Sequence, residues 1–253
     1  KLDAPLPQVE KPLMMTQILN DLRTKNPHKN LSDSLAQGLC LTSDLVIIGL
    51  GNAASDADQR YANTPHNLGA NVVQELEYIF TERLQHIYRS DLVRFDQATC
   101  TIVHMGKHRL ILIRNLSNIN TAGQAILTAQ SLAGAETQTG IPITELLRDC
   151  PAIIVADDIE SGLDQPPVCQ PFNATDPHNG VASCDELGGK PVVIKIGARP
   201  EHSNHANPRT QVIEPYSTSE SEKLTDAMNR GLQRLVLAML VVDEAEFFGI
   251  TTE

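Results

Sequence analysis

The sequence has little cysteine and no long apolar run. Its five cysteines are odd in number, and no two of them have the C-x-x-C spacing. They are Cys40, Cys100, Cys150, Cys169 and Cys184. Such scattered cysteines favour neither a disulfide framework nor a zinc site, so we expect plain thiols in a reducing compartment. The longest apolar run, LVLAMLVV at residues 235–242, is far shorter than the roughly 18 residues that span a bilayer, so we expect no membrane partner.

Positive charge is also scarce. The chain of 253 residues has 20 Lys and Arg against 31 Asp and Glu, which gives a net charge of −11. Proteins that bind phosphate backbones do so through Lys and Arg that displace counterions, and they usually carry basic excess on at least one face. A nucleic-acid ligand would therefore need a local basic patch on this acidic chain.

From residue 44 onward, short β-branched runs alternate with stretches of helical spacing. The strand-like runs are 44–52, 98–105, 108–115, 151–158 and 190–197, and the helical stretches are 63–80, 121–133 and 219–242. This alternation predicts an α/β fold, a single domain over 44–253 with a mostly parallel twisted sheet flanked by helices. Residues 1–43, with one expected helix at 13–25, read as an N-terminal extension.

Polar residues follow three of the predicted strands, where the carboxyl ends of parallel strands form the usual ligand site. They are Asn52, Asn115, Asn118, Asn120, Asp157 and Asp158. Any one of them could be a turn or cap residue, because Asn and Asp favour those positions. Amides at three strand ends, with a histidine near them, favour a catalytic site.

That histidine is His66, in the first turn of the helix that begins near Thr64. Thr64 or Asn63 suits the N-cap, and Pro65 suits the first helical position. The partial positive charge of a helix N-terminus disfavours the imidazolium, so the ring can act as a base. If Asp157 accepts one ring N–H, the other nitrogen faces a water, as in catalytic His–Asp pairs. Alternatively, His66 is a solvated first-turn residue.

Five segments in order resemble the motifs of bacterial-type peptidyl-tRNA hydrolases. The segments are GLGN with Tyr61 and TPHNLG (49–69), NINTAG (118–123), VADDIE (155–160), PHNG (177–180) and IKIGARP (194–200). The resemblance covers roughly residues 44–245. It implies the family's fold and its reaction, hydrolysis of the ester that joins a peptide to the tRNA ribose.

The resemblance also implies roles, position by position. His66 matches the base, Asp157 the carboxylate that orients it, and Asn52 a catalytic amide. The matching substrate-binding residues are Tyr61, Asn120, His178, Asn179 and Arg199. No metal and no cofactor is implied, because the ester carbonyl is already activated and amides can stabilise the oxyanion. The implied partner is the acceptor end of peptidyl-tRNA.

The sequence departs from the family pattern where tRNA would be gripped. Pro65 replaces the usual arginine, and the segment 160–180 holds no Lys or Arg. Ala156 stands for a histidine and Lys195 for a glycine, while the C-terminal helix begins with acidic residues. Lost phosphate contacts would weaken tRNA binding.

These departures leave more than one function open. The protein is either an active hydrolase that relies on a partner such as the ribosome, or a hydrolase-derived structural or assembly factor of a ribosome. GLGNAA also invites a nucleotide-binding interpretation, but the third glycine of the dinucleotide fingerprint is missing. An extended bacterial-type member would suit the mitochondrial matrix of a eukaryote, with the cytoplasm as the alternative.

Overall fold

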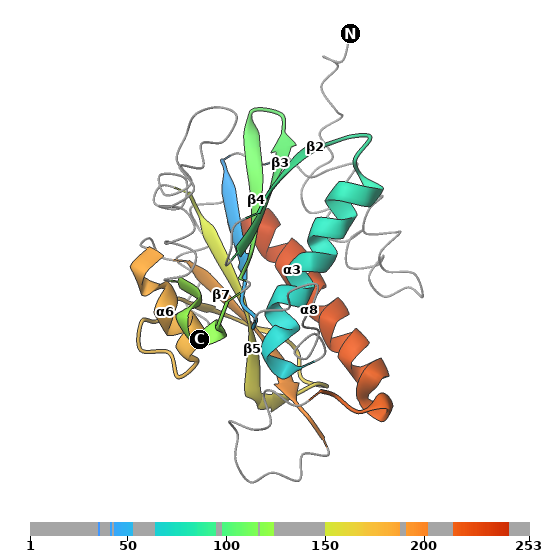
Figure 1. The fold of residues 1–253 in the computed structure, drawn as a ribbon, viewed down its shortest axis with the longest axis vertical. Helices are drawn as coiled ribbons and strands as arrows, with labels where there is room; N and C mark the ends of the chain where they lie inside the picture. Colours follow the sequence, from blue (N-terminus) through green and yellow to red (C-terminus); the bar gives the residue numbers. More distant parts are fainter. Residues whose placement is uncertain are drawn as a thin grey trace.

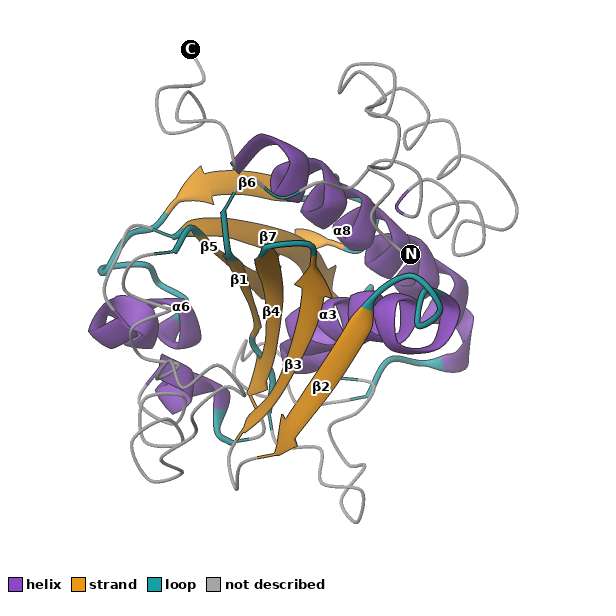
Figure 2. Ribbon diagram, turned by 90° about the horizontal axis from the view of Figure 1, so that it is seen from above, coloured by secondary structure: helices purple, strands orange, loops and turns teal. Residues whose placement is uncertain are grey.

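A seven-stranded sheet forms the centre of the molecule, with helices on both faces (Figures 1 and 2). The structure is a computed structural model that describes residues 35, 41, 43–52, 64–94, 98–115, 117–123, 150–187, 191–201 and 215–242. Across the sheet, the strands are β2 (Arg89–Arg94), β3 (Ala98–Met105), β4 (His108–Asn115), β1 (Leu45–Gly49), β5 (Ala152–Gly162), β7 (Val192–Arg199) and β6 (Val168–Pro171). The expected α/β class, with one sheet flanked by helices, is confirmed.

The parallel part of the sheet is its centre, where β4, β1, β5 and β7 run in one direction. β2, β3 and β6 pair antiparallel at the two sides. β3 and β4 are joined by a tight hairpin in which Gly106 adopts a positive φ of 67°, a conformation that suits glycine. The sequence by itself does not predict β2 and β6, because "RSDLVR" is polar and "VCQP" is short and contains proline. Both are edge strands, where such residues are tolerated.

Two long helices cover one face of the sheet (Figures 1 and 2). α3 (Leu68–Tyr78) follows a 3₁₀ turn, η2 (Pro65–Asn67), and continues into a π-helical turn, η3 (Ile79–Arg83). α8 (Ser221–Val242) follows η6 (Thr218–Glu220), and packs against α3 and β7. The opposite face carries α6 (Asn179–Ser183) and the 3₁₀ turns η4 (Ile119–Thr121) and η5 (Cys184–Leu187).

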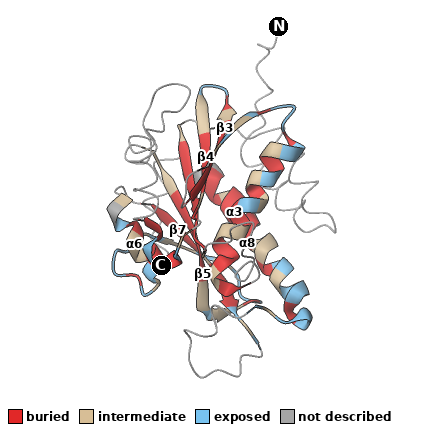
Figure 3. Cartoon of the chain, viewed as in Figure 1, coloured by how far each residue is buried: buried red, intermediate tan, exposed pale blue. Residues whose placement is uncertain are grey.

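The buried apolar residues form two clusters, one on each face of the sheet. Buried residues are concentrated in the central strands (Figure 3). The larger cluster lies between the sheet and the pair α3 and α8, and the smaller one lies under η4 and α6. Leu35 and Leu41 belong to the larger cluster, and the Tyr88 hydroxyl donates to the Leu35 carbonyl over 3.3 Å. Residues just before 44 therefore contribute to the same core as the sheet.

The predicted helix at 13–25 and most of the predicted helix at 121–133 lie outside the described residues. The predicted C-terminal helix is observed, as η6 and α8. In the described part of the chain, no helix is long and apolar enough to cross a membrane.

Candidate active site

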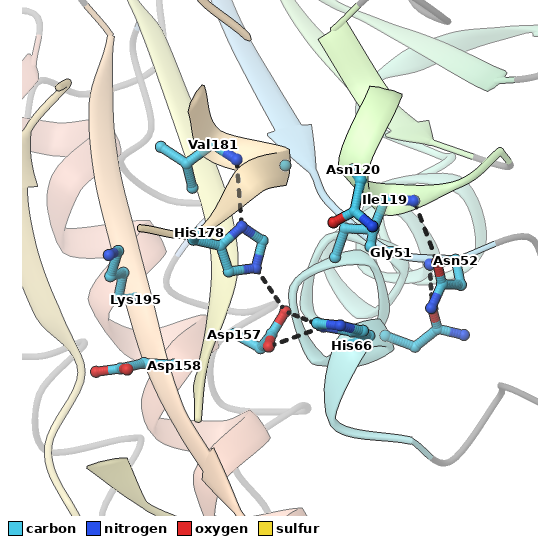
Figure 4. Close-up of polar contacts among 12 residues, drawn as sticks. Gly51, Asn52, His66, Ile119, Asn120, Asp157, Asp158, His178, Val181 and Lys195 are labelled. Carbon is cyan, nitrogen blue, oxygen red and sulfur yellow. Dashed lines mark hydrogen bonds and ion pairs between the residues drawn. The ribbon is translucent and has the colours of Figure 1, made fainter. Parts of the chain in front are cut away.

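Polar residues from β5 and from the segments that follow β1 and β4 meet the start of α3 (Figure 4). Asn52 follows β1, Asn120 lies in η4 just after β4, and Asp157 is part of β5. His66 lies in η2, immediately before α3. The structure thus places these four side chains around one site, at the position where open α/β sheets bind ligands.

Backbone contacts hold the start of α3 against β5. The Leu50 N–H donates to the Val155 carbonyl and the Ala70 N–H donates to the Leu50 carbonyl, each over 2.9 Å. Gly69 makes the approach possible, because a Cβ at this position would collide with the Val155 carbonyl oxygen. Since Val155 precedes Asp157 by two residues, this packing brings η2 beside the Asp157 carboxylate.

His66 and Asp157 are hydrogen-bonded. The Nδ1 atom of His66 lies 3.1 Å from Oδ2 and 3.3 Å from Oδ1 of Asp157. The Asp157 side chain is fully buried, whereas that of His66 is 18% exposed. A carboxylate only accepts hydrogen bonds, so Nδ1 is the donor, and in the neutral ring Nε2 is left as an acceptor. Nε2 can therefore take a proton from a water molecule.

A second histidine contacts the same carboxylate from the other side. The Nε2 atom of His178 lies 3.0 Å from Oδ1 of Asp157, and the two imidazole rings meet edge to face at 6.0 Å (Figure 4). The other ring nitrogen, Nδ1, accepts the Val181 N–H over 3.2 Å and so caps α6. Both nitrogens of His178 thus have partners within the protein.

These contacts control the charge of Asp157. Burial by itself would raise the pKa of this carboxyl, but the hydrogen bonds from His178 and His66 outweigh burial and hold the pKa well below its usual range. Burial likewise opposes the charged form of His178, and the adjacent Asp157 overcomes it and raises the pKa of His178. The Val181 N–H acts in the opposite sense, because it requires an unprotonated Nδ1. Asp157 is therefore an anion held between two hydrogen-bond donors.

Asn52 has a fixed side-chain orientation. Its Oδ1 accepts the Ile119 N–H over 3.1 Å, so the opposite end of the amide is the NH₂ group. Its backbone N–H donates over 2.6 Å to Oδ1 of Asn67, which is the residue after His66. Asn52 thereby links the loop after β1 to both η4 and η2 (Figure 4), and it presents two N–H donors.

The model of the peptidyl-tRNA hydrolase family matches residues 46–247. The chain belongs to this family. A peptidyl-tRNA hydrolase from Syntrophomonas wolfei is 26% identical over 192 residues, which cover 73% of this chain and 87% of that protein. The family resemblance found in the sequence is therefore confirmed.

Solved structures of peptidyl-tRNA hydrolases share the fold. The enzyme from Acinetobacter baumannii is 17% identical, with a TM-score of 0.52 over 82% of this chain and 98% of its own. A complex of a peptidyl-tRNA hydrolase with N-propanol gives a TM-score of 0.51, with the same identity and coverage. At this level of identity the likeness concerns the fold alone.

The active-site cluster also has the composition of a metal site, because it contains two histidines, His66 and His178, and the carboxylate of Asp157. One potential ligand atom from each of the three lies within 4.8 Å of the others. However, a histidine that binds a metal through Nε2 carries its proton on Nδ1, and the Nδ1 of His178 accepts the Val181 N–H. The observed hydrogen bonding fits a proton network better than it fits a metal site.

Three of the other predicted substrate-binding residues are exposed in the described part of the chain. Asn120 is exposed on η4, and Asn179 is exposed at the start of α6. α6 packs closely on η4, since a Cβ on Gly180 would lie 2.7 Å from the Ile119 carbonyl oxygen. Arg199 is exposed at the end of β7. Tyr61 lies outside the described residues.

Three polar residues that were expected at strand ends have local structural contacts. The Asn115 amide is buried and donates to the Gly51 carbonyl over 2.6 Å, which supports the loop that carries Asn52. Asn118 accepts the Asn120 N–H over 2.9 Å. Asp158 accepts from the Glu160 N–H and the Ser161 hydroxyl and points away from His66 (Figure 4). These contacts match the turn and cap roles that the sequence analysis left open for single Asn and Asp residues.

The sequence by itself predicts no role for Asn67 or for the Val181 N–H. Asn67 is buried and positions Asn52, and its place beside His66 in the TPHNLG motif was an available signal. The Val181 N–H had no sequence signal, because it is a backbone group whose partner depends on the tertiary fold.

Proposed function

We propose that the protein hydrolyses the ester bond of peptidyl-tRNA, with His66 as general base and Asp157 as the group that orients it. The observation that supports this most is the hydrogen bond from His66 Nδ1 to a buried anionic carboxylate, which leaves Nε2 free to accept a proton. Family membership supports the substrate class.

In this reaction a water molecule attacks the ester carbonyl carbon while His66 Nε2 takes one of its protons. The carbonyl oxygen becomes an oxyanion in the tetrahedral intermediate. The bond from that carbon to the ribose oxygen then breaks, and the imidazolium returns the proton to the ribose oxygen. The products are a tRNA with a free ribose hydroxyl and a peptide with a free carboxyl group, which loses the second proton of the water to the solvent and becomes a carboxylate.

The Asn52 NH₂ group suits the oxyanion. The Ile119 N–H fixes the amide orientation, so the two donors are organised before substrate binds. The exposed Asn120 side chain lies on η4, the turn that contains Ile119. We assign Asn120 and Asn179 to the peptide and to the acceptor end of the tRNA, as the family resemblance implies.

In the described parts of the chain, intramolecular pairing reduces the number of basic side chains that are available to tRNA phosphates. Several Lys and Arg are paired with acidic groups: Arg89 with Asp91, Arg109 with Asp44, Arg114 with Glu77, Lys195 with Asp176 and Lys223 with Glu201. Arg230 donates to the Leu163 carbonyl. We therefore propose that a partner such as the ribosome delivers the substrate, because paired cations contribute little to phosphate binding.

Release of the N-acetyl-aminoacyl group from tRNA tests the proposal. Wild type should release it at low salt, where tRNA binding is strongest, and His66→Ala should not. The matched control is His104→Ala, since His104 also pairs with an aspartate, Asp91, over 2.8 Å but lies on β3. Absence of release by wild type at low salt would overturn the hydrolase proposal.

The same pairing of basic side chains in the described residues favours a second candidate, a hydrolase-derived assembly factor of a ribosome. This candidate predicts association with ribosomal particles that is unchanged in His66→Ala. Co-sedimentation measures it, and a protein that fails to sediment with the particles would not be such a factor.

A further inference from the structure

A buried ion pair lies next to the catalytic cluster, between β7 and the loop that precedes α6. The Nζ atom of Lys195 is 2.8 Å from Oδ1 of Asp176, and the two side chains are only 13% and 2% exposed. Asp176 also accepts from the Gln170 side-chain amide over 3.1 Å and from the His178 backbone N–H over 2.8 Å. This carboxylate therefore ties together β7, β6 and the loop that carries His178.

The pair is connected to Asp157 through His178. Asp176 binds the backbone of His178, and the ring of His178 donates from Nε2 to Asp157 over 3.0 Å. The Val181 N–H binds Nδ1 of His178 and so limits rotation of the imidazole relative to the backbone. A shift of the His178 backbone would therefore move the imidazole as well. A short series of contacts thus leads from Lys195 to the carboxylate that orients His66.

The sheet register shows why a lysine fits at this position. Lys195 on β7 is paired in register with Ala156 on β5, the residue just before Asp157. Ala156 is fully buried and has only a methyl group, so it leaves space on this face of the sheet for a longer neighbour. The two departures from the family pattern, alanine at 156 and lysine at 195, therefore lie side by side.

We propose that the Lys195–Asp176 pair is a positioning device for the active site: it holds the His178 backbone so that the His178 ring keeps Asp157 in place for His66. This proposal deepens the hydrolase function proposed above and rests on it. A buried ion pair contributes little net stability, but the loss of one partner leaves an uncompensated charge that must rearrange. Removal of Lys195 should therefore displace Asp176 and with it His178.

Kinetics with Lys195→Met test the proposal, with Lys223→Met as control. Lys223 also pairs with an acid, Glu201, but this pair is exposed on the surface. We expect Lys195→Met to lower kcat by about 10- to 100-fold with KM nearly unchanged, since a displacement of a catalytic group by about 1 Å can cost about 100-fold. Lys223→Met should leave kcat unaltered. Lys195→Gln, which keeps a donor for Asp176, should recover most of the loss and also serves if Lys195→Met does not fold.

A double-mutant cycle separates positioning from general stability. If Lys195 acts through His178, then Lys195→Met should have no further effect on kcat in a His178→Asn background. Equal losses of kcat in the two backgrounds would overturn the proposal, because they would mean that Lys195 acts independently of His178.

A spectroscopic measurement needs no turnover. Long-range ¹H–¹⁵N correlation of the imidazoles should show wild-type His178 as the Nε2–H tautomer, and Lys195→Met should shift its signals while those of His104 stay constant. Unchanged His178 signals would overturn the positioning proposal even if wild type is active. Shifted signals with no turnover in wild type would support the positioning and overturn the hydrolase function.

Discussion

The replacement of Asp157 by asparagine should abolish most of the activity, although the two side chains have nearly the same size and shape. Asp157 accepts hydrogen bonds from two histidines at once, over 3.1 Å from His66 and over 3.0 Å from His178. An asparagine can accept with one oxygen only, so its NH₂ group would face the N–H of one histidine. That histidine must change tautomer or turn away.

Both outcomes damage the site. If His66 changes tautomer, its proton moves to Nε2 and the ring no longer accepts a proton from water. If His178 changes tautomer, its Nδ1 gains a proton and opposes the Val181 N–H that it now binds. General base catalysis contributes about 10²- to 10⁴-fold to a rate, which corresponds to about 3 to 5 kcal/mol of barrier. We expect Asp157→Asn to lower kcat by an amount in this range and to change KM little.

Single-turnover release of N-acetyl-aminoacyl groups from tRNA measures this loss, with far-UV circular dichroism as the check on folding. Asp158→Asn is the matched control, because the neighbouring carboxylate binds Glu160 and Ser161 and points away from His66 (Figure 4). Its kcat should equal that of wild type. A kcat for Asp157→Asn within about threefold of wild type, with His66→Ala inactive, would refute the orienting role of Asp157.

Three further predictions concern pH, packing and salt. The folded-state pKa of Asp157 lies below the ordinary 3.8, so its contribution to stability is complete above that value and is lost as pH falls below it. In urea titrations at falling pH, the free energy of unfolding should decrease more steeply for wild type than for Asp157→Asn, and parallel curves would contradict this. Gly69→Ala should lower the free energy of unfolding by about 1 to 3 kcal/mol and should also lower kcat, because the new Cβ would collide with the Val155 carbonyl. A wild-type free energy of unfolding together with a wild-type kcat would contradict the close packing. Arg199→Ala should reduce the slope of log binding constant against log salt concentration for tRNA by about one. Lys107→Ala, on the β3–β4 hairpin, is the control and should leave this slope unchanged. Equal slopes for Arg199→Ala and wild type would show that Arg199 does not contact tRNA.

Much of the central sheet was predictable from local sequence. The runs 98–105 and 108–115 are observed as β3 and β4 with the same bounds, because continuous β-branched and apolar residues favour strands that are buried on both faces. The edge strands β2 and β6 could not be predicted in this way. Their residues are polar or short of apolar pattern, and they become strands only because a neighbouring strand offers them hydrogen-bond partners.

The candidate site, like the sheet, was predictable from the sequence only in part. The sequence by itself determined which residues belong to the family motifs. It also determined that His66 would lie in the first turn of a helix, since proline and cap residues act on the local backbone. The contact between His66 and Asp157 agrees with the expected pairing, although the two residues are 91 positions apart. Only the tertiary structure decided that His178 contacts Asp157 and that Lys195 meets Asp176. Those partners come from strands and loops that are far apart in the sequence. They form hydrogen bonds only because the sheet register and the close packing of glycine-containing turns bring these segments together.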